Sequence, residues 1–293
     1  MDRRQVFLLA AHFSSRETLG LFARLQAQTA GLGDSFILYH RRSGRPVPRA
    51  VLRRPHYVVD DDRLEKLGYY EPSFSLIPGR THFPLLCFRQ DHPYLFYWFI
   101  EYDVRFRGAW GDLFRHFEDS NEDLLTCHLR RYADEPAWSW WSSMSHENET
   151  IPPRDYVRSF NTVCRFSGRA LEHVDQMHQA GWRGHQEVLV PTLLQRDGFR
   201  IRDLGGRGEF VAPGDRDRFY LDATDPHLAD GTMRYRPPHV FLSRVPKGRL
   251  AHPVKTHRVI RCLAERLPIP VRRALSPTAI QRRLAALARY RHL

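Results

Sequence analysis

The sequence predicts an α/β protein with a mostly parallel central sheet and helices on its faces. Two observations predict this class. Gln5–Ala11, a helical pattern and Ser35–Tyr39 give strand, helix and strand within the first forty residues, the opening of a parallel α/β domain. Tyr94–Ile100 is an unbroken run of aromatic, β-branched and leucine residues, the composition of a strand buried on both faces. We expect the sheet to be centred on this run.

The helix after the first strand should begin at Ser14, which can form a capping box with Glu17. The apolar residues expected on its buried face are Leu19, Phe22, Ala23, Ala27 and Ala30. No G-x-G-x-x-G follows the first strand, so the dinucleotide-binding fingerprint is absent.

Tyr57–Asp62 ends a short strand in three acids, which allow two interpretations. Their simplest role is to cap the next helix and to interact favourably with its dipole. Alternatively, Asp60 accepts hydrogen bonds from a ribose or a base. Residues 71–92 are rich in proline and are expected to form a loop.

The rest of the chain continues the alternation of strands and helices. Apolar residues at helical spacing predict a helix packed on the sheet over Trp110, Leu113, Phe114 and Phe117. Further strands are expected at Asp123–Leu129, Tyr156–Arg165 and Phe199–Leu204, and further helices from Ser167 to near Gly181 and over His185–Leu194. We expect residues 205–240 to be loop-rich and a smaller antiparallel portion to follow Glu187.

Composition indicates a cytoplasmic globular protein. The 293 residues are 42% hydrophobic, and no apolar run approaches the ~20 residues that span a bilayer. The apolar segment near the start is short and lacks a clear cleavage site, so we interpret it as a strand rather than a signal peptide. The isolated cysteines that argue against zinc sites and disulfides are Cys87, Cys127, Cys164 and Cys262.

Most of the net charge of +12 is at the C-terminal end. Residues 255–293 contain ten Lys or Arg and one acid, which leaves a net +3 for the preceding residues. In 257–293 apolar residues recur at helical spacing among arginines, which predicts a basic amphipathic tail after a domain at 1–256. The tail either lies on an anionic membrane surface, at the inner face of the cell membrane, or packs on the domain. Nucleic acid is not an expected partner, because nucleic-acid-binding proteins more often carry their positive charge on a folded face than in a tail.

Three tryptophans fall within four residues at Trp138, Trp140 and Trp141. The flanking proline and polar residues indicate an irregular segment, so we do not expect all three rings in the core. They form either a small surface cluster or a binding surface for a sugar, whose C–H faces stack on aromatic rings.

Two carboxylates follow the central apolar run, at Glu101 and Asp103. On extended backbone, positions i and i+2 project to the same side, ~6.6–7 Å apart at Cα. Such a pair can share one oxygen-seeking cation, Mg²⁺ or Mn²⁺, at the end of a strand where α/β sheets bind ligands. The alternative is a solvated pair that forms salt bridges with Arg105 or Arg107.

Three short motifs, and their order along the chain, resemble those of the GT-A-fold, nucleotide-sugar-dependent glycosyltransferases, in particular an uncharacterised bacterial branch. The motifs are the strand-end E-x-D, a Q-E that opens a helix about eighty residues later, and a late H-P-V-K. The resemblance implies a GT-A-like, Rossmann-like catalytic domain. It also implies metal ligation by Asp103, Glu101 and His252 and an acidic catalytic residue at Glu187. Glu101 replaces the usual first aspartate, so Asp103 is the more secure ligand, and Val188 stands where a second acid often occurs.

For activity, the resemblance implies transfer of a sugar from a nucleotide-diphosphate donor to a saccharide or lipid-linked acceptor. Mn²⁺ or Mg²⁺ would neutralise the leaving diphosphate, and Glu187 would act as base, which gives inversion. If Glu187 lies instead against the β face of the sugar, retention is the alternative. The expected nucleotide and diphosphate contacts are His12, Ser14, Asp60, Arg105 and Lys255, and the expected acceptor contacts are the three tryptophans. A metal-dependent hydrolase or nucleotidyltransferase that uses the same carboxylates is the main alternative.

Overall fold

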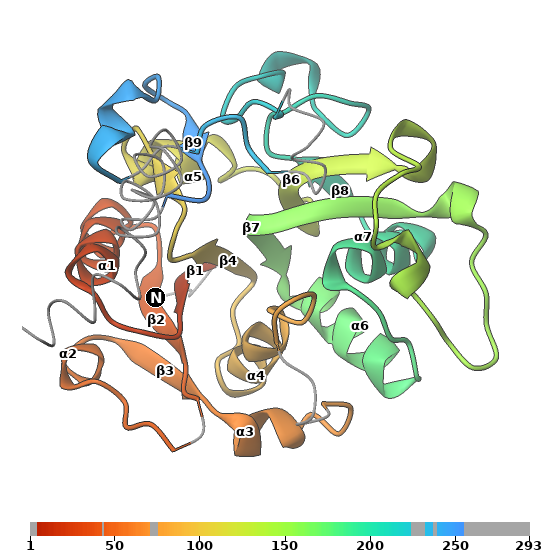
Figure 1. Ribbon diagram of the computed structural model, residues 1–293, viewed down its shortest axis with the longest axis horizontal. Coiled ribbons are helices and arrows are strands. Elements are labelled where there is room, and N and C mark those ends of the chain that lie inside the picture. The colour runs from red at the N-terminus through yellow and green to blue at the C-terminus, as the bar shows by residue number, and fades with distance from the viewer. Residues whose placement is uncertain (1–4, 43, 71–75, 224–231, 237–238, 255–293) are drawn as a thin grey trace, which may run out of the picture.

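The computed structural model describes residues 5–42, 44–70, 76–223, 232–236 and 239–254. A seven-stranded sheet runs through the molecule (Figure 1), with six strands parallel and β7 reversed. Its spatial order is β3 (His56–Val59), β2 (Asp34–His40), β1 (Gln5–Ala11), β4 (Phe96–Glu101), β7 (Val157–Ser167), β6 (Leu124–Arg131) and β8 (Ile201–Asp203). The mostly parallel α/β sheet is thereby confirmed, and its middle strand is β4, as the apolar run 94–100 predicts.

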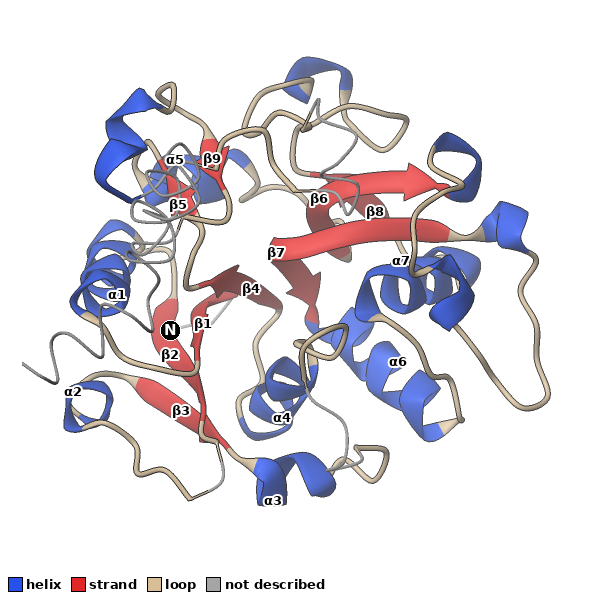
Figure 2. Cartoon of the chain, viewed as in Figure 1, coloured by secondary structure: helices blue, strands red, loops and turns tan. Residues whose placement is uncertain are grey.

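The apolar strands β1 and β4 separate two hydrophobic cores. Alternate side chains of β1 enter opposite cores, with Phe7 and Leu9 on one side and Val6 and Leu8 on the other. Helices α1 (Arg16–Gln28) and α5 (Trp110–His116) cover the first face. Helices α4 (Phe83–Asp91) and α6 (Gly168–Gln179) cover the second (Figure 2). Burial on both faces explains why neither strand shows polar alternation.

Helix α1 begins one residue later than its sequence suggests. The side chain of Ser15, not Ser14, accepts a hydrogen bond from the backbone N–H of Thr18, at 3.1 Å. The buried face also differs from the expected one: it contains Leu21, Phe22 and Leu25, whereas Ala23, Ala27 and Ala30 are exposed. The larger side chains occupy the core because they bury more apolar area than alanine.

The prediction of a loop over residues 71–92 is wrong from residue 83 onward. Helix α4 occupies Phe83–Asp91, and all its residues from Phe83 to Phe88 are buried. Pro84 lies in the first turn, where a missing N–H leaves no hydrogen bond unmade, so this proline starts a helix rather than breaking one. The shorter helices are α2 (Arg49–Leu52) and α3 (Asp61–Glu65).

The antiparallel structure is arranged differently from our expectation. The reversed strand β7 precedes Glu187, and a second, two-stranded sheet pairs β5 (Arg105–Phe106) with β9 (Leu250–Ala251). Helix α7 (Gln186–Arg196) contains Pro191, as expected, and follows α6. Short 3₁₀ helices occupy Tyr132–Asp134, Trp141–Ser143, Pro153–Asp155, Pro213–Asp215 and His239–Arg244.

Cys87, Cys127 and Cys164 are buried and unpaired. No helix in the described part of the chain combines the length and apolar character needed to cross a membrane. Cys262 and the expected tail at 257–293 lie outside the described residues, as does the boundary between tail and domain.

Candidate active site

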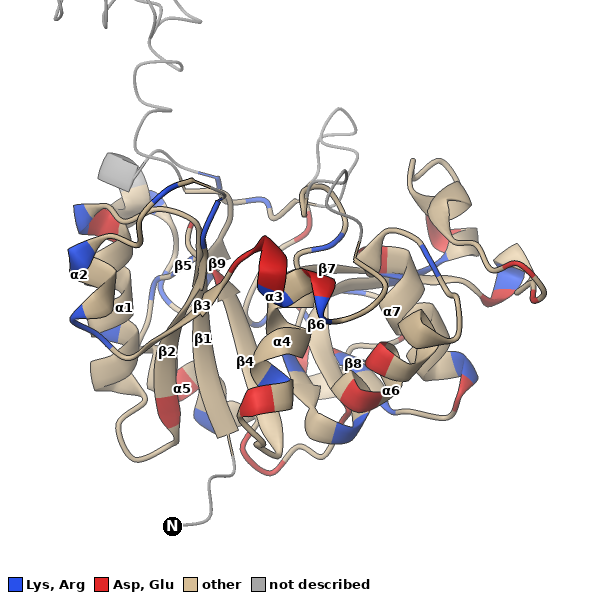
Figure 3. Ribbon diagram, turned by 90° about the horizontal axis from the view of Figure 1, so that it is seen from below, with Lys and Arg blue, Asp and Glu red and all other residues tan. Residues whose placement is uncertain are grey.

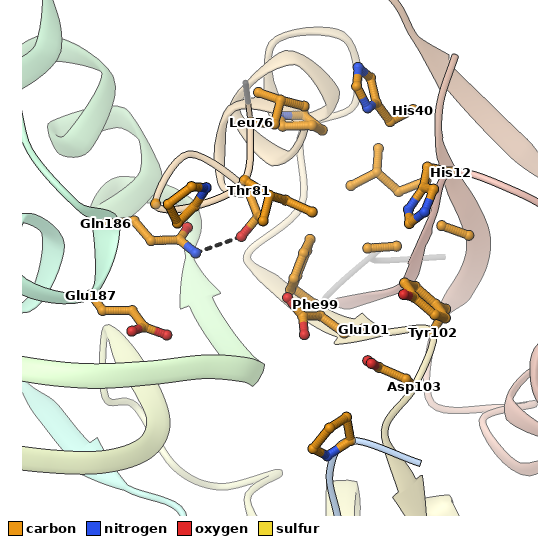
Figure 4. A pocket seen from close by; sticks show the side chains of 18 of the residues that line it. His12, His40, Leu76, Thr81, Phe99, Glu101, Tyr102, Asp103, Gln186 and Glu187 are labelled. Atoms are coloured by element: carbon orange, nitrogen blue, oxygen red, sulfur yellow. Dashed lines mark hydrogen bonds between the residues drawn. The ribbon is translucent and has the colours of Figure 1, made fainter. Parts of the chain in front are cut away.

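A pocket of about 390 Å³ lies at the carboxyl ends of β1 and β4. One side is formed by residues at the ends of these strands, including Glu101, the last residue of β4, and His12, which follows β1, and the other side by the first turn of α7 (Figure 4). The volume lies within the range of small-ligand sites. Parallel strands that end at one edge of a sheet commonly place ligand-binding residues together there.

Three residues of this pocket form a cluster of possible metal ligands. Nε2 of His252 lies 3.4 Å from an Oε of Glu101 and 3.4 Å from an Oδ of Asp103. One ligand atom from each residue falls within 4.8 Å of the others. The structure therefore brings together the strand-end pair and the distant histidine that the sequence singled out.

The small sheet explains how a late residue reaches the end of β4. Pairing of Arg105 with Ala251 brings the chain back beside the segment that follows β4. The backbone N–H of Val254 then donates to the carbonyl of Asp103, at 2.8 Å. His252, between these two contacts, is held with its ring facing both carboxylates.

The chemistry of the three groups fits one hard or borderline cation. Carboxylate oxygens and an imidazole nitrogen suit Mn²⁺, and carboxylates suit Mg²⁺. Atoms bound to one ion at ~2.1 Å lie ~3–4.2 Å apart, similar to the separations found here. Although burial lowers the pKa of His252, hydrogen bonds to Asp103 and Glu101 raise it to about 9. The same two carboxylates that raise this pKa would attract a cation to this position.

Glu187 enters the same pocket from the opposite side. It lies in the first turn of α7, with its side chain only 14% exposed, and points into the pocket across from Asp103 (Figure 4). Burial raises the pKa of Glu187 to about 8, Glu101 adds to this, and Arg158 opposes it. A carboxylate with a pKa near neutrality is suited to accept a proton during a reaction.

A contact between the segment around Gly79 and the first turn of α7 closes the pocket beside Glu187. The backbone N–H of Gln186 donates to the carbonyl of Gly79 at 2.8 Å, and its side-chain amide donates to Oγ1 of Thr81 at 2.5 Å. Gly79 has φ +87°, and a Cβ there would lie 2.5 Å from Cδ2 of His185. Only glycine permits this approach. The sequence reading missed the contact, because the paired segments are far apart in the chain.

The expected nucleotide contacts are dispersed. His12 lines the pocket, whereas Ser14, Asp60 and Arg105 are not among its lining residues.

Asp60 caps α3 by accepting a hydrogen bond from the backbone N–H of Arg63 and forms an ion pair with Arg41, which confirms the capping interpretation. The guanidinium of Arg105 donates to the carbonyls of Tyr102 and Val104. Lys255 lies outside the described residues. His40, which we did not single out, lines the pocket with its buried Nε2 unpaired.

The tryptophan segment packs beside the pocket. Trp138 and Trp141 are each 5% exposed and belong to a hydrophobic cluster with Trp182 and α7. Trp140 is half-buried and stacks on His185, with ring centroids 4.6 Å apart. Because His185 lines the pocket, Trp140 is the tryptophan whose ring is linked to it most directly.

We expect Trp141→Ala to lower the free energy of unfolding by ~3–5 kcal/mol, the cost of truncating a buried aromatic ring. Trp140→Ala should cost clearly less, because its ring is half-buried. Urea denaturation of both variants checks this. A greater loss for Trp140→Ala would contradict the difference in packing.

No protein-family model and no curated protein matches this chain in sequence. Its fold is similar to several solved structures. Glucosyl-3-phosphoglycerate synthase from Mycobacterium tuberculosis, in complex with Mn²⁺, uridine-diphosphate-glucose and glycerol 3-phosphate, is 14% identical over 73% of this chain and 74% of that one, with a TM-score of 0.40. CMP:2-keto-3-deoxy-manno-octonic acid synthetase complexed with CTP is 15% identical over 73% and 93%, with a TM-score of 0.37. Mouse xyloside xylosyltransferase 1 is 14% identical over 70% and 86%, with a TM-score of 0.35.

Proposed function

We propose that this protein is a glycosyltransferase that moves a sugar, of hexosyl type, from a nucleotide-diphosphate donor to a saccharide or lipid-linked acceptor. The observation that carries the proposal is the arrangement of the pocket. Glu101, Asp103 and His252 converge on one side, and Glu187 faces them from the other. A cation site and a separate carboxylate are the two groups that such a transfer needs.

In the proposed reaction, Asp103, Glu101 and His252 would hold Mn²⁺ or Mg²⁺, which stabilises the charge that develops on a leaving diphosphate. Glu187 accepts the proton of the acceptor hydroxyl as that oxygen attacks the anomeric carbon. Glu187 and the carboxylate cluster occupy opposite sides of the pocket (Figure 4). A sugar bound between them would have the acceptor on one face and the leaving group on the other. This arrangement favours inversion. Trp140, which stacks on the N-cap residue His185 of α7, would contact the acceptor.

The charge of the pocket supports a strict need for the cation. Three carboxylates line it, whereas none of its described lining residues is Lys or Arg. A diphosphate would meet repulsion from Glu101 and Asp103 unless a cation intervened. Lys255, the next basic residue after His252 in the sequence, is the candidate for an additional contact to the diphosphate.

We therefore expect nucleoside diphosphates to raise the melting temperature only when Mn²⁺ or Mg²⁺ is present. A ligand at ~100 times its Kd adds ~2.7 kcal/mol, a shift of several degrees for a domain of this size. A thermal-shift screen of uridine, guanosine, cytidine and adenosine diphosphates and their sugars, with and without cation, measures this. Equal stabilisation without cation would contradict the proposal.

The same screen separates the second candidate, a metal-dependent nucleotidyltransferase or hydrolase. The carboxylate cluster alone would serve either chemistry. A nucleotidyltransferase should be stabilised most by a nucleoside triphosphate, and a glycosyltransferase by a nucleotide sugar. The absence of Lys and Arg among the described residues of the pocket lining favours the less charged diphosphate.

We further propose that the domain at 1–256 carries this activity at the cytoplasmic face of the cell membrane, where the basic segment 257–293 contacts anionic lipid. Ten Lys or Arg against one acid in 255–293 support this placement. Such a location suits an enzyme that extends a lipid-linked or cell-envelope polysaccharide.

A further inference from the structure

A basic surface surrounds the short helix α2 on the folded body of the protein. Between Arg41 and Arg54 the sequence has six arginines and no acid, although residues before 255 carry a net charge of only +3. We propose that the α2 surface, defined as Arg42, Arg45, Arg49, Leu52 and Arg53, binds an anionic membrane. This inference concerns a second region of the chain and does not depend on the reaction proposed above.

Four of the arginines are available to an external partner. Arg41 pairs with Asp60, and the guanidinium of Arg54 donates to the carbonyl of Ala50. The other four, at 42, 45, 49 and 53, are exposed, and their side chains have no ion-pair or hydrogen-bond partner among the described residues. In Figure 3, Lys and Arg positions gather around α2 and the neighbouring α1, whereas acidic positions gather at α3. Unpaired guanidinium groups close together attract phosphate-bearing surfaces.

An exposed leucine stands among these charges. Leu52 ends α2 and is 50% exposed, while its neighbour Val51 is 1% exposed and fixes the helix to the core. Arg53 follows Leu52 directly, and Arg49 precedes it by three residues, about one helical turn. A leucine surrounded by arginines is the arrangement that binds at a membrane interface, where the leucine enters the acyl boundary and the arginines meet the headgroups.

The α2 surface is connected to the pocket. Burial lowers the pKa of His40, Asp61 opposes this, and Arg42 lowers it further, which places Arg42 near a pocket-lining residue. The basic segment 255–293 follows directly after His252 and Pro253 of the same pocket. The α2 surface therefore lies close to the pocket, and a membrane bound by it would lie close to the pocket as well.

A membrane explains the surface better than a nucleic acid does. Proteins that bind single strands combine cationic residues with aromatic rings on which bases stack. The α2 surface contains no aromatic residue, and its exposed apolar side chain is aliphatic. Lipid acyl chains take up an aliphatic side chain, whereas a polynucleotide offers it no apolar partner.

The test is flotation of the full-length protein with phosphatidylcholine vesicles, with and without phosphatidylglycerol. Arg45→Glu/Arg53→Glu is compared with Arg154→Glu/Arg216→Glu, which removes two exposed arginines elsewhere and makes the same change in net charge. Leu52→Ser is compared with Leu95→Ser. Leu95 is 56% exposed but precedes the amino end of β4, whereas α2 follows the carboxyl end of β2.

We expect Arg45→Glu/Arg53→Glu to weaken partitioning onto anionic vesicles at least ~10-fold, because each near-surface arginine contributes severalfold. Leu52→Ser should weaken it severalfold, and both control variants should bind as the wild type does. Melting temperatures of the variants establish that they are folded. Equal losses in test and control variants would overturn the proposal. A loss of oligonucleotide binding with unchanged vesicle binding would also overturn it and would reassign the surface to nucleic acid.

Discussion

Replacing Asp103 by asparagine is expected to lower Mn²⁺ affinity ~100-fold or more and to abolish cation-dependent nucleotide binding. Asp103 is 5% exposed and 3.4 Å from His252 in the centre of the carboxylate cluster. Asparagine keeps the size of the side chain but removes the charge that attracts a cation. Even partners that only orient metal ligands are worth 10- to 100-fold in affinity, so loss of a ligand should cost at least as much.

The measurement is titration of Mn²⁺ followed by electron paramagnetic resonance, which reports binding without any assumption about the reaction. Asp112→Asn is the matched control, because Asp112 is exposed on α5 and lies outside the pocket. Wild-type Mn²⁺ affinity in Asp103→Asn would remove the cation site from the proposed function. Asp103→Asn weakens the ion pair between Asp103 and His252. This change is not expected to unfold the protein, since Asp103 and His252 lie outside both hydrophobic cores.

Replacing Glu187 by glutamine should reduce turnover ~10²–10⁴-fold, the usual contribution of a positioned general base. Affinity for the nucleotide and cation should change little, because Glu187 lies across the pocket from Glu101 and Asp103. The same change should stabilise the fold. The pKa of Glu187 is raised to about 8 from 4.5, so the folded state disfavours its ionised form.

The size of this effect depends on pH. A carboxyl group with a raised folded pKa favours the folded state most below 4.5 and progressively loses that contribution as pH rises to about 8. The stability gained by Glu187→Gln should therefore increase over this interval and reach up to ~3 kcal/mol at pH 7, at ~1.4 kcal/mol per pKa unit. Urea denaturation at several pH values measures it, with Glu172→Gln on α6 as an exposed control.

Two results would contradict this role for Glu187. The first is wild-type turnover in Glu187→Gln, and the second is a loss of nucleotide affinity that accounts for the whole defect. In the wild type, the pH–rate profile should rise with an apparent pKa at or below about 8. A cation bound beside Glu101 would lower it by removing part of the repulsion between the carboxylates.

The sequence by itself was sufficient for the central strand and for the carboxylates that follow it. Residues 94–100 carry a local signal, because a strand buried on both faces must be apolar throughout. Glu101 and Asp103 follow that strand directly, so their position at the edge of the sheet depends only on local order. The first turn of α7, with Glu187, was also recognisable from residues close together in the chain. The helix at 83–91 was missed because Pro84 was read as a loop residue.

How residues far apart in the sequence come to share the pocket is visible only in the folded structure. His252 reaches Asp103 through the pairing of β5 with β9, and Gly79 meets Gln186 across the pocket. Burial likewise decided that Trp138 and Trp141 pack in a hydrophobic cluster while Trp140 stacks beside the pocket. These contacts join segments far apart in sequence. Side-chain periodicity is a property of neighbouring residues, and it carries no information on which two segments will pair.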